Sequence, residues 1–274
     1  MSVLKHGRTA AALAAAAVLA AGWLLPGCSA VREDRTAPQA SWSQDLDRAA
    51  KSPDYYYSAG RARLDDGPVA RGRIIYPKPD RLGRTGRVVA DVTAQTAAEG
   101  RARDRSDMEA IRPSGWPAHN PLVLIRVGDN LVYRGRLFNR SHLVAKSLGG
   151  ENRVENMITG TRTQNVGVND QRRPGGMQYT EMKAASWLAS HPDGDVRYDA
   201  TPLYRGDEPI PRGVAVDVRS SDGTIDEHVT VANTAAGIPV DYTGHGDYSE
   251  YERQALESRG RGQGRARGSS WGRR

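Results

Sequence analysis

The chain has 274 residues, of which 38% are apolar and 26% charged, which fits one large domain or two small ones and excludes a polytopic membrane protein. Lys and Arg number 39 and Asp and Glu 32, which gives a net charge of +7. This balance favours anionic partners, nucleic acid or anionic lipid first, although the charge alone fits a basic protein without such a partner equally well.

The first 27 residues have the pattern of a bacterial export signal. Lys5 and Arg8 precede an Ala/Leu/Val-rich run, Thr9 to Leu25, that is too short for a comfortable membrane span. The only cysteine, Cys28, follows a small residue at the end of this run, which resembles the lipobox of bacterial lipoproteins. We therefore expect an extracytoplasmic protein, secreted or lipid-anchored to the bacterial cell membrane at Cys28. Plain secretion with cleavage nearby and a retained signal anchor are the alternatives.

Both ends of the remaining chain lack a sustained hydrophobic period. Residues 28–54 are polar and contain Pro38 and Pro53, which predicts a flexible tether. Residues 246–274 are expected to form a basic, Gly/Arg-rich disordered tail, in which the stretch from Arg259 onward is nearly all Gly, Arg and Ser. The tail is either an arm that tracks phosphates or a solvated end without a role. The domain itself is expected over residues 55–245.

Short strands with turns between them begin this domain. Residues 73–76 and 87–92 read as two strands around a Pro/Gly-rich turn. Residues 122–127 and 131–138 read as a hairpin, with Gly128-Asp129-Asn130 at its turn.

A helix and a second hairpin follow further along the chain. Residues 177–188 have helical spacing and end before His191-Pro192-Asp193-Gly194. Residues 214–218 and 228–231 flank the turn Asp222-Gly223 and give the strongest hairpin signal. Antiparallel hairpins with inserted helices predict an α+β fold and argue against a Rossmann-type sheet.

Potentially reactive side chains are densest after the hairpin of residues 122–138. They are Asn139, Arg140, Ser141, His142, Asn152, Asn156, Gln164, Asn165, Asn169 and Glu181. Each alone has a structural explanation, such as a turn, a cap or an exposed helix face. Together they suit chemistry on a phosphodiester, because Arg140 places a cation beside His142, a potential proton acceptor. Asparagine oxygens suit a hard cation such as Mg²⁺.

Other reaction classes lack their motifs. The sequence has no pair of cysteines, no His-Glu-x-x-His and no Gly-x-x-x-x-Gly-Lys-Ser/Thr loop, which removes the basis for a zinc protease or a nucleoside triphosphatase. It also has no Gly-x-Ser-x-Gly, and Ser141 beside His142 does not make a catalytic triad.

At these residues the chain resembles the bacterial DNA/RNA non-specific endonucleases, in particular the branch typified by streptococcal DNA-entry nucleases. That family carries Asp-Arg-Gly-His after a strand, a metal-binding Asn on a following helix and a Glu on a later helix. The matching residues are Asn139-Arg140-Ser141-His142-Leu143, Glu155-Asn156, Gln164-Asn165 and Tyr179-Thr180-Glu181. Similar flanking text lies at residues 80–84, 112–116 and 241–244, so the resemblance covers roughly residues 55–245.

The resemblance implies a ββα-metal (His-Me finger) fold, with a central antiparallel sheet and flanking helices. It implies that His142 is the general base for the attacking water and that Asn165 is the direct protein ligand of one Mg²⁺, with waters in most other positions. Asn156 would hold the metal's waters or the substrate, Glu181 would orient a metal-bound water, and Arg140 would contact phosphate. Products in this family carry a 5′-phosphate.

The chain departs from the family pattern at three positions. Asn139 replaces the Asp of the motif, which keeps the shape and loses a charge that could orient the catalytic imidazole. Ser141 replaces the Gly and adds a side chain. Ala185 stands one turn after Glu181, where some relatives carry an Arg. The basic residues that could replace that phosphate contact are Lys183, Arg162, Arg172 and Arg173.

The sequence thus predicts an exported, Mg²⁺-dependent endonuclease, with Mn²⁺ as an alternative metal, that hydrolyses DNA, with RNA as a further candidate, without strong sequence preference. A rival from another class is a non-catalytic nucleic-acid-binding or envelope-polymer-binding lipoprotein built on a decayed nuclease domain. The rival predicts salt-sensitive binding without cleavage. A secreted antibacterial toxin is a third hypothesis, but the short tether gives no sign of a delivery module.

Overall fold

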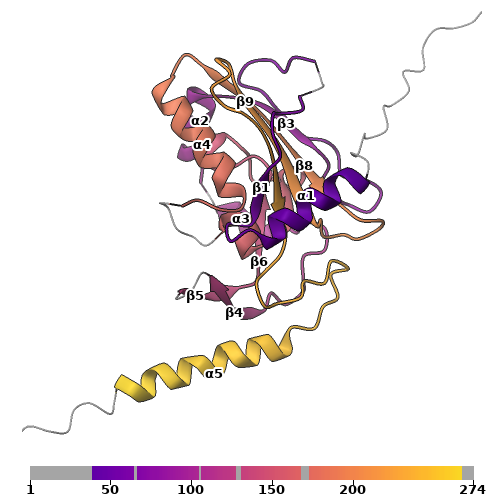
Figure 1. Ribbon diagram of the computed structural model, residues 1–274, viewed down its shortest axis with the longest axis vertical. Helices are drawn as coiled ribbons and strands as arrows, with labels where there is room; N and C mark the ends of the chain where they lie inside the picture. The colour runs from indigo at the N-terminus through magenta and orange to yellow at the C-terminus, as the bar shows by residue number, and fades with distance from the viewer. Residues whose placement is uncertain (1–38, 65–66, 105, 128–130, 168–172, 267–274) are drawn as a thin grey trace, which may run out of the picture. The chain divides into compact units, whose positions relative to one another are not determined.

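The main sheet has six strands, all antiparallel, in the order β1-β10-β9-β8-β3-β2 (Figure 1). The structure is a computed structural model that describes residues 39–64, 67–104, 106–127, 131–167 and 173–266. The strands are β1 (Tyr56–Ser58), β2 (Ile74–Ile75), β3 (Val88–Thr93), β8 (Asp195–Leu203), β9 (Gly213–Ser220) and β10 (Asp226–Ala232).

The paired strands predicted from alternation are confirmed. β2 pairs with β3, and β9 pairs with β10 over the whole of the second hairpin. The α+β class follows, since five helices accompany the strands among the described residues. The longest strand, β8, was not predicted, because Arg197, Asp199 and Pro202 interrupt its apolar pattern.

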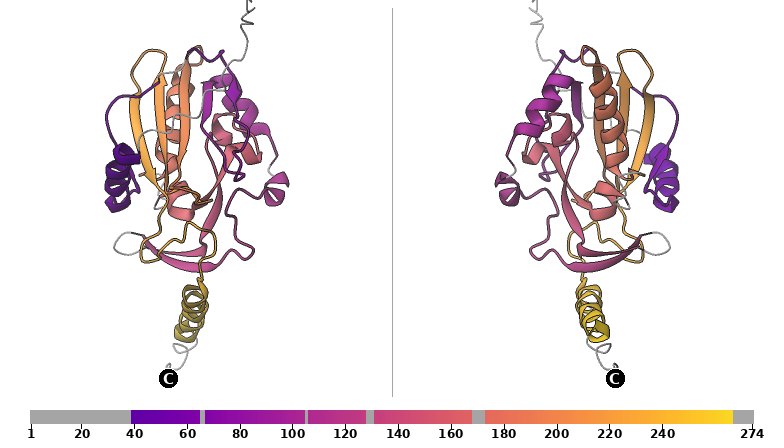
Figure 2. Two further views of the ribbon diagram at one scale, coloured as in Figure 1. Left: turned by 90° about the vertical axis from the view of Figure 1, so that its right-hand side faces the viewer. Right: turned by 90° about the vertical axis from the view of Figure 1, so that its left-hand side faces the viewer.

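Helices lie on both faces of the main sheet, as the two views of Figure 2 show. Helices α2 (Ala94–Ala102) and α4 (Met177–Ser190) cover one face, where Leu188 packs with Tyr198 and Val231. Helix α1 (Gln39–Lys51) covers part of the other, where Trp42 and Leu46 pack against Ala232. Val231 and Ala232 belong to different clusters because successive residues of a strand point to opposite faces.

A second, two-stranded sheet is the antiparallel hairpin of β4 (Leu122–Val127) and β5 (Leu131–Arg136). Val123 and Ile125 are fully buried in a separate cluster with Tyr248, which leads into α5 (Ser249–Ala266). The predicted hairpin is confirmed, but its second strand ends at Arg136 instead of residue 138. Its turn, residues 128–130, lies outside the described residues.

A third, two-stranded sheet carries the candidate site. It consists of β6 (Phe138–His142) and β7 (Met157–Thr161), and helix α3 (Arg162–Val166) follows directly. The fully buried Asn233 joins this unit to the end of β10, because its side chain accepts a hydrogen bond from the Thr161 N–H (2.7 Å) and donates one to the Thr159 carbonyl (3.0 Å). The Asn233 amide thus satisfies backbone groups of β7 that a neighbouring strand would otherwise satisfy.

The two ends of the domain differ from the sequence prediction. Residues 39–51 of the expected tether form α1, and Trp42, Leu46 and Ala49 at helical spacing bury one face of it. Likewise, α5 (Ser249–Ala266) lies entirely within residues 246–274, which were expected to form a disordered tail. The predicted signal peptide, Cys28 and residues 267–274 lie outside the described residues. Among the described helices, none combines the length and apolar character needed to cross a membrane.

Candidate active site

The site is built on the strand-strand-helix unit β6-β7-α3. The register pairs Phe138 with Thr161 and His142 with Met157, so the histidine stands at the end of β6. Thr161 caps α3, since its side-chain oxygen accepts a hydrogen bond from the Gln164 N–H (3.0 Å). Gly160 has no side chain because the Gln164 side chain occupies that space. The short turn from β7 into α3 therefore fixes the helix against β6.

His142 is half-buried, and its ring contacts an asparagine from a loop. The Nε2 atom lies 3.1 Å from Oδ1 of Asn152. Beyond the histidine, Leu143 and Val144 are fully buried in the main core, which anchors the backbone on that side. The imidazole is therefore positioned by its strand, by the buried residues that follow and by its contact with Asn152.

The Asn156 side chain is engaged entirely with backbone. It is fully buried, its Oδ1 accepts from the Val144 N–H (2.9 Å), and its Nδ2 donates to the carbonyls of Val144 and Glu151 (3.0 Å each). Both amide hydrogens are used, which differs from the expected role of holding metal waters or substrate. The geometry instead favours a role in positioning the segment that follows His142.

Asn165, the expected metal ligand, lies on α3 and is half-buried. Ser141 Oγ donates a hydrogen bond to its Oδ1 at 3.1 Å. This contact joins the helix to the strand residue directly before His142. A carbonyl oxygen has two lone pairs, so one remains for another partner when the serine takes the first. The serine that replaces the family's glycine thus orients the expected ligand.

Glu181 lies on α4, one turn after its start at Met177. Its side chain keeps partial exposure, yet the surrounding protein removes so much of its hydration that the pKa rises to about 8. Within the described residues it makes no hydrogen bond or ion pair. Among the described residues, no hydrogen bond joins Glu181 to His142 or Asn165.

Arg140 is held by neutral groups instead of carboxylates. Its Nε donates to the Ile111 carbonyl (2.7 Å) and one terminal nitrogen to the Glu109 carbonyl (2.9 Å), while the guanidinium stacks on Trp116 at 4.1 Å. Burial, with Arg112 nearby, lowers the pKa of Arg140. The positive charge is therefore fixed in place and not neutralised by these contacts, which use two of the five N–H donors of the guanidinium.

The other basic residues considered for a phosphate contact have partners of their own. Lys183 pairs with Glu227, and Arg173 pairs with Asp54 at 2.9 Å. Arg162 lies over the Tyr133 ring at 5.1 Å. Arg172 and Asn169 lie outside the described residues.

The residues present fit a hard divalent cation that keeps most of its waters. The described part of the chain contains no cluster of three or more His, Cys, Asp or Glu. The Asn165 oxygen and the Glu181 carboxyl are hard donors. The raised pKa of Glu181 indicates a carboxyl that lacks a cationic partner, and a nearby cation or its waters would favour its ionised form.

Asn152 had no role assigned from the sequence, although it belongs to the dense group of candidate residues. Asn139, which replaces the motif Asp, makes no side-chain hydrogen bond to His142 among the described residues. The imidazole instead contacts Asn152, ten positions downstream in the loop of residues 149–152. An asparagine after two glycines predicts a turn and carries no signal of a histidine contact.

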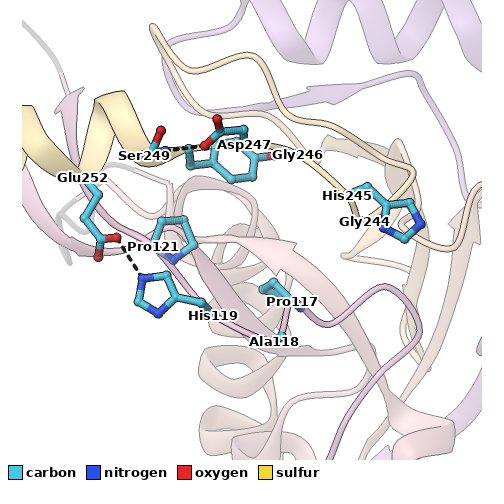
Figure 3. A pocket seen from close by; sticks show the side chains of 11 residues that line it. Pro117, Ala118, His119, Pro121, Gly244, His245, Gly246, Asp247, Ser249 and Glu252 are labelled. Atoms are coloured by element: carbon cyan, nitrogen blue, oxygen red, sulfur yellow. Dashed lines mark hydrogen bonds and ion pairs between the residues drawn. The ribbon is translucent and has the colours of Figure 1, made fainter.

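A pocket elsewhere in the domain contains two histidines and two acids but none of the expected site residues (Figure 3). Within it, His119 contacts Glu252 at 2.8 Å, and Asp247 accepts from the Ser249 N–H at 2.9 Å, which caps the start of α5. Glu252 also accepts from the Leu122 N–H. Glu252 thus joins α5 to the hairpin, whereas Asp247 bonds within its own segment, so we place the chemistry at β6.

The profile of the family described as DNA/RNA non-specific endonuclease matches residues 79–260, which include β6, β7, α3 and α4. The chain belongs to this family. It is similar to a deoxyribonuclease of Streptococcus dysgalactiae subsp. equisimilis, with 48% identity over 124 residues. That match covers 45% of this chain and 37% of the relative, so the chain spans little more than a third of the curated protein that it matches.

Solved structures confirm the ββα-metal fold of this endonuclease family. The structure of the Sda1 nuclease with bound zinc is 34% identical, with a TM-score of 0.67, and the match covers 73% of this chain and 98% of that one. NucA from Streptococcus agalactiae with magnesium bound is 20% identical, with a TM-score of 0.55, covering 77% of this chain and 96% of that chain. At that identity the second likeness concerns the fold alone.

Proposed function

We propose that this protein is a metal-dependent endonuclease that hydrolyses phosphodiester bonds of DNA, with RNA as a further substrate, and leaves 5′-phosphate ends. One observation carries the proposal. The end of β6 presents His142, and the preceding Ser141 is hydrogen-bonded to Asn165 on α3, so a potential base and a hard oxygen donor come from adjoining elements of one ββα unit. Membership of the endonuclease family supports the same chemistry.

His142 acts as the general base. It takes a proton from the water that attacks phosphorus, the bond from phosphorus to the 3′-oxygen breaks, and the 3′-oxygen takes a proton from solvent. The phosphate then stays on the 5′ side. Half-burial suits this role because the ring is held in one orientation while an edge remains accessible.

Asn165 and Glu181 would hold the metal and its waters, Asn165 as direct ligand and Glu181 by orienting a water. A bound Mg²⁺ or Mn²⁺ would supply positive charge against the charge that gathers on the phosphate and the leaving 3′-oxygen. The similar solved structures include one with bound zinc and one with bound magnesium, so the cleavage assay below compares these metals.

Arg140 and Asn156 support the site in different ways. Arg140 contributes a fixed positive charge that favours an anionic substrate, although its Nε and one terminal nitrogen are held by carbonyls. Asn156 positions the backbone after His142 through three hydrogen bonds. Contacts to phosphates carry no base sequence, which accounts for cleavage with weak sequence preference.

Cleavage of supercoiled plasmid by the purified protein tests this function. The assay compares Mg²⁺, Mn²⁺, Zn²⁺ and EDTA, and end-labelling with and without phosphatase identifies the 5′ ends of the products. We expect nicking with a divalent metal, none with EDTA, and 5′-phosphate ends. Binding that shifts the plasmid on a gel and weakens with salt, without nicking in any metal, would instead support the non-catalytic lipoprotein.

We also propose that the protein is exported and lipid-anchored through Cys28, on the basis of the charged start, the apolar run and the cysteine at its end. Replacing Cys28 by Ser is expected to release the protein from membranes into the soluble fraction. Membrane association that persists in Cys28→Ser would point to a retained signal anchor.

A further inference from the structure

Three segments of the chain meet in a short series of hydrogen bonds at the catalytic histidine. The Asn152 Nδ2 atom donates to the backbone carbonyl of Asp104 at 3.3 Å, and its Oδ1 atom lies 3.1 Å from His142 Nε2. Asp104 follows α2, Asn152 lies in the loop between β6 and β7, and His142 ends β6. The asparagine amide thus bridges a fixed carbonyl and the imidazole.

This arrangement determines which atom of the asparagine faces the ring. A carbonyl oxygen can only accept a hydrogen bond, so the atom that faces Asp104 must be the amide nitrogen. The amide oxygen therefore faces His142. An amide oxygen also can only accept, so Nε2 of the ring must carry the hydrogen in this contact. A neutral imidazole has one N–H, which leaves the lone pair on Nδ1.

The loop that carries Asn152 is held on both sides. Arg103 donates to the carbonyls of Gly149 (2.6 Å) and Gly150 (3.2 Å). The Glu151 N–H donates to the Tyr76 hydroxyl at 3.0 Å, and the Glu151 carbonyl accepts from buried Asn156. These bonds involve the three residues directly before Asn152, so its amide is presented to the histidine by an ordered backbone.

We propose that Asn152 is a positioning residue that holds His142 as its Nε2–H tautomer. The proposal rests on the proposed function, in which His142 is the general base. It also explains how the site operates with Asn139 in place of the motif Asp, because the orientation of the ring comes from the β6–β7 loop. Unlike a carboxylate, the Asn152 amide orients the ring without adding negative charge beside it.

Nitrogen-15 NMR of the imidazole ring tests the tautomer without any nuclease assay. Long-range proton–nitrogen spectra at a pH where His142 is neutral separate a protonated from an unprotonated ring nitrogen, and the spectrum of His142→Ala assigns the signal among the six histidines. We expect Nε2 to be protonated in the wild type. In Asn152→Ala the signals should move toward a mixture of the two tautomers. Asn152→Asp keeps an acceptor oxygen and should restore the Nε2–H form.

Asn120→Ala is the matched control for loss of asparagine hydrogen bonds. Asn120 exchanges two bonds with the Phe138 backbone, at the start of β6, and its amide is not bonded to a histidine. This variant should keep the wild-type tautomer. Single-turnover cleavage should slow by about two- to tenfold in Asn152→Ala, the loss of one hydrogen bond to the ring, with Asn152→Asp nearer to the wild type and KM unchanged in both.

The outcomes separate this proposal from the proposed function. A wild-type ring protonated at Nδ1, or an Asn152→Ala ring that remains fully in the Nε2–H form, would overturn the role of Asn152 even if cleavage is normal. A protein in which His142→Ala cleaves at the wild-type rate would overturn the proposed function while leaving the tautomer assignment intact. If Asn152→Ala fails to fold, the Asn152→Asp spectrum and rate decide, since only the tautomer proposal predicts that both are retained.

Discussion

The middle of the six-stranded sheet and the end of β6 both hold polar side chains away from water, but they satisfy them differently. In the sheet, Asp199 is 1% exposed and is paired with both Arg87 and Arg197. Around the candidate site, Glu181 on α4 has no hydrogen-bond partner and buried Gln164 on α3 has none for either polar atom, within the described residues. The contrast indicates that the polar groups in the sheet stabilise the fold, whereas polar groups around the candidate site lack partners in the protein, which lowers stability.

The largest expected effect on stability comes from the sheet. Asp199→Ala leaves two arginines without their buried partner, so the free energy of unfolding should fall by about 3–5 kcal/mol. Urea unfolding measures the change, and the rate per folded molecule should stay normal. The control is Asp207→Ala, whose carboxylate is 76% exposed and pairs with exposed Arg81, so the loss should stay below about 1 kcal/mol. Equal losses in the two variants would remove the distinction between the regions.

At the β6 edge the expected effect is on metal use. Asn165→Ala removes the proposed direct ligand, so the Mg²⁺ concentration for half-maximal cleavage should rise by at least about tenfold, with little change in DNA binding. Asn165→Asp keeps a hard oxygen and should restore activation. Metal titrations of the cleavage rate measure the shift. Unchanged half-maximal concentrations in the alanine variant would place the metal elsewhere.

Glu181 should make the stability of the metal-free protein depend on pH. Its folded pKa of about 8 lies above the ordinary value of 4.5, so the folded state binds this proton more tightly than the unfolded state. The contribution of Glu181 is therefore fully present below about pH 4.5 and is lost as pH rises through about 8. In EDTA, Glu181→Gln should flatten the decline of Tm over this window. Parallel curves for the two proteins would show that the carboxyl is ionised at neutral pH.

The smallest expected effect concerns the hydroxyl that orients Asn165. Ser141→Ala removes one hydrogen bond at a fully buried position, so the Mg²⁺ requirement should rise by about two- to tenfold. Ser190→Ala is the control, because its hydroxyl bonds only to its own helix and to His191. A Ser141→Ala protein with a lower Mg²⁺ requirement would mean that the serine competes with the metal for the Asn165 oxygen.

The sheet and the site differed in what could be predicted from sequence. Alternation and turn residues predicted β9 and β10, since the alternation of apolar and polar residues and an Asp-Gly turn are local signals. The sequence did not predict β8, because its buried Asp199 is stabilised by Arg87, directly before β3, and by Arg197 of β8 itself, and this pairing depends on strand register. α1 was not predicted because its apolar side chains are few and its flanks are rich in proline.

For the site, the residue types and their order could be predicted, but their contacts could not. The order of His142, Asn165 and Glu181 along the chain carried the family resemblance, which the family profile confirmed. Asn156 was expected to hold the metal's waters or the substrate, but its side chain is buried and makes three hydrogen bonds to backbone atoms. Asn152 is the asparagine that contacts the imidazole. Both facts depend on how the loop between β6 and β7 folds back, which no local pattern encodes.

The most direct test of the account is single-turnover cleavage of a labelled DNA duplex by His142→Ala, measured with thermal unfolding of the same protein. We predict a loss of about 10²- to 10⁴-fold in rate, typical of a removed general base, with substrate binding nearly unchanged. The Tm should stay close to the wild type, because the side chain at the end of β6 is only half-buried. A normal rate in the folded variant would contradict the assignment of the chemistry to the end of β6.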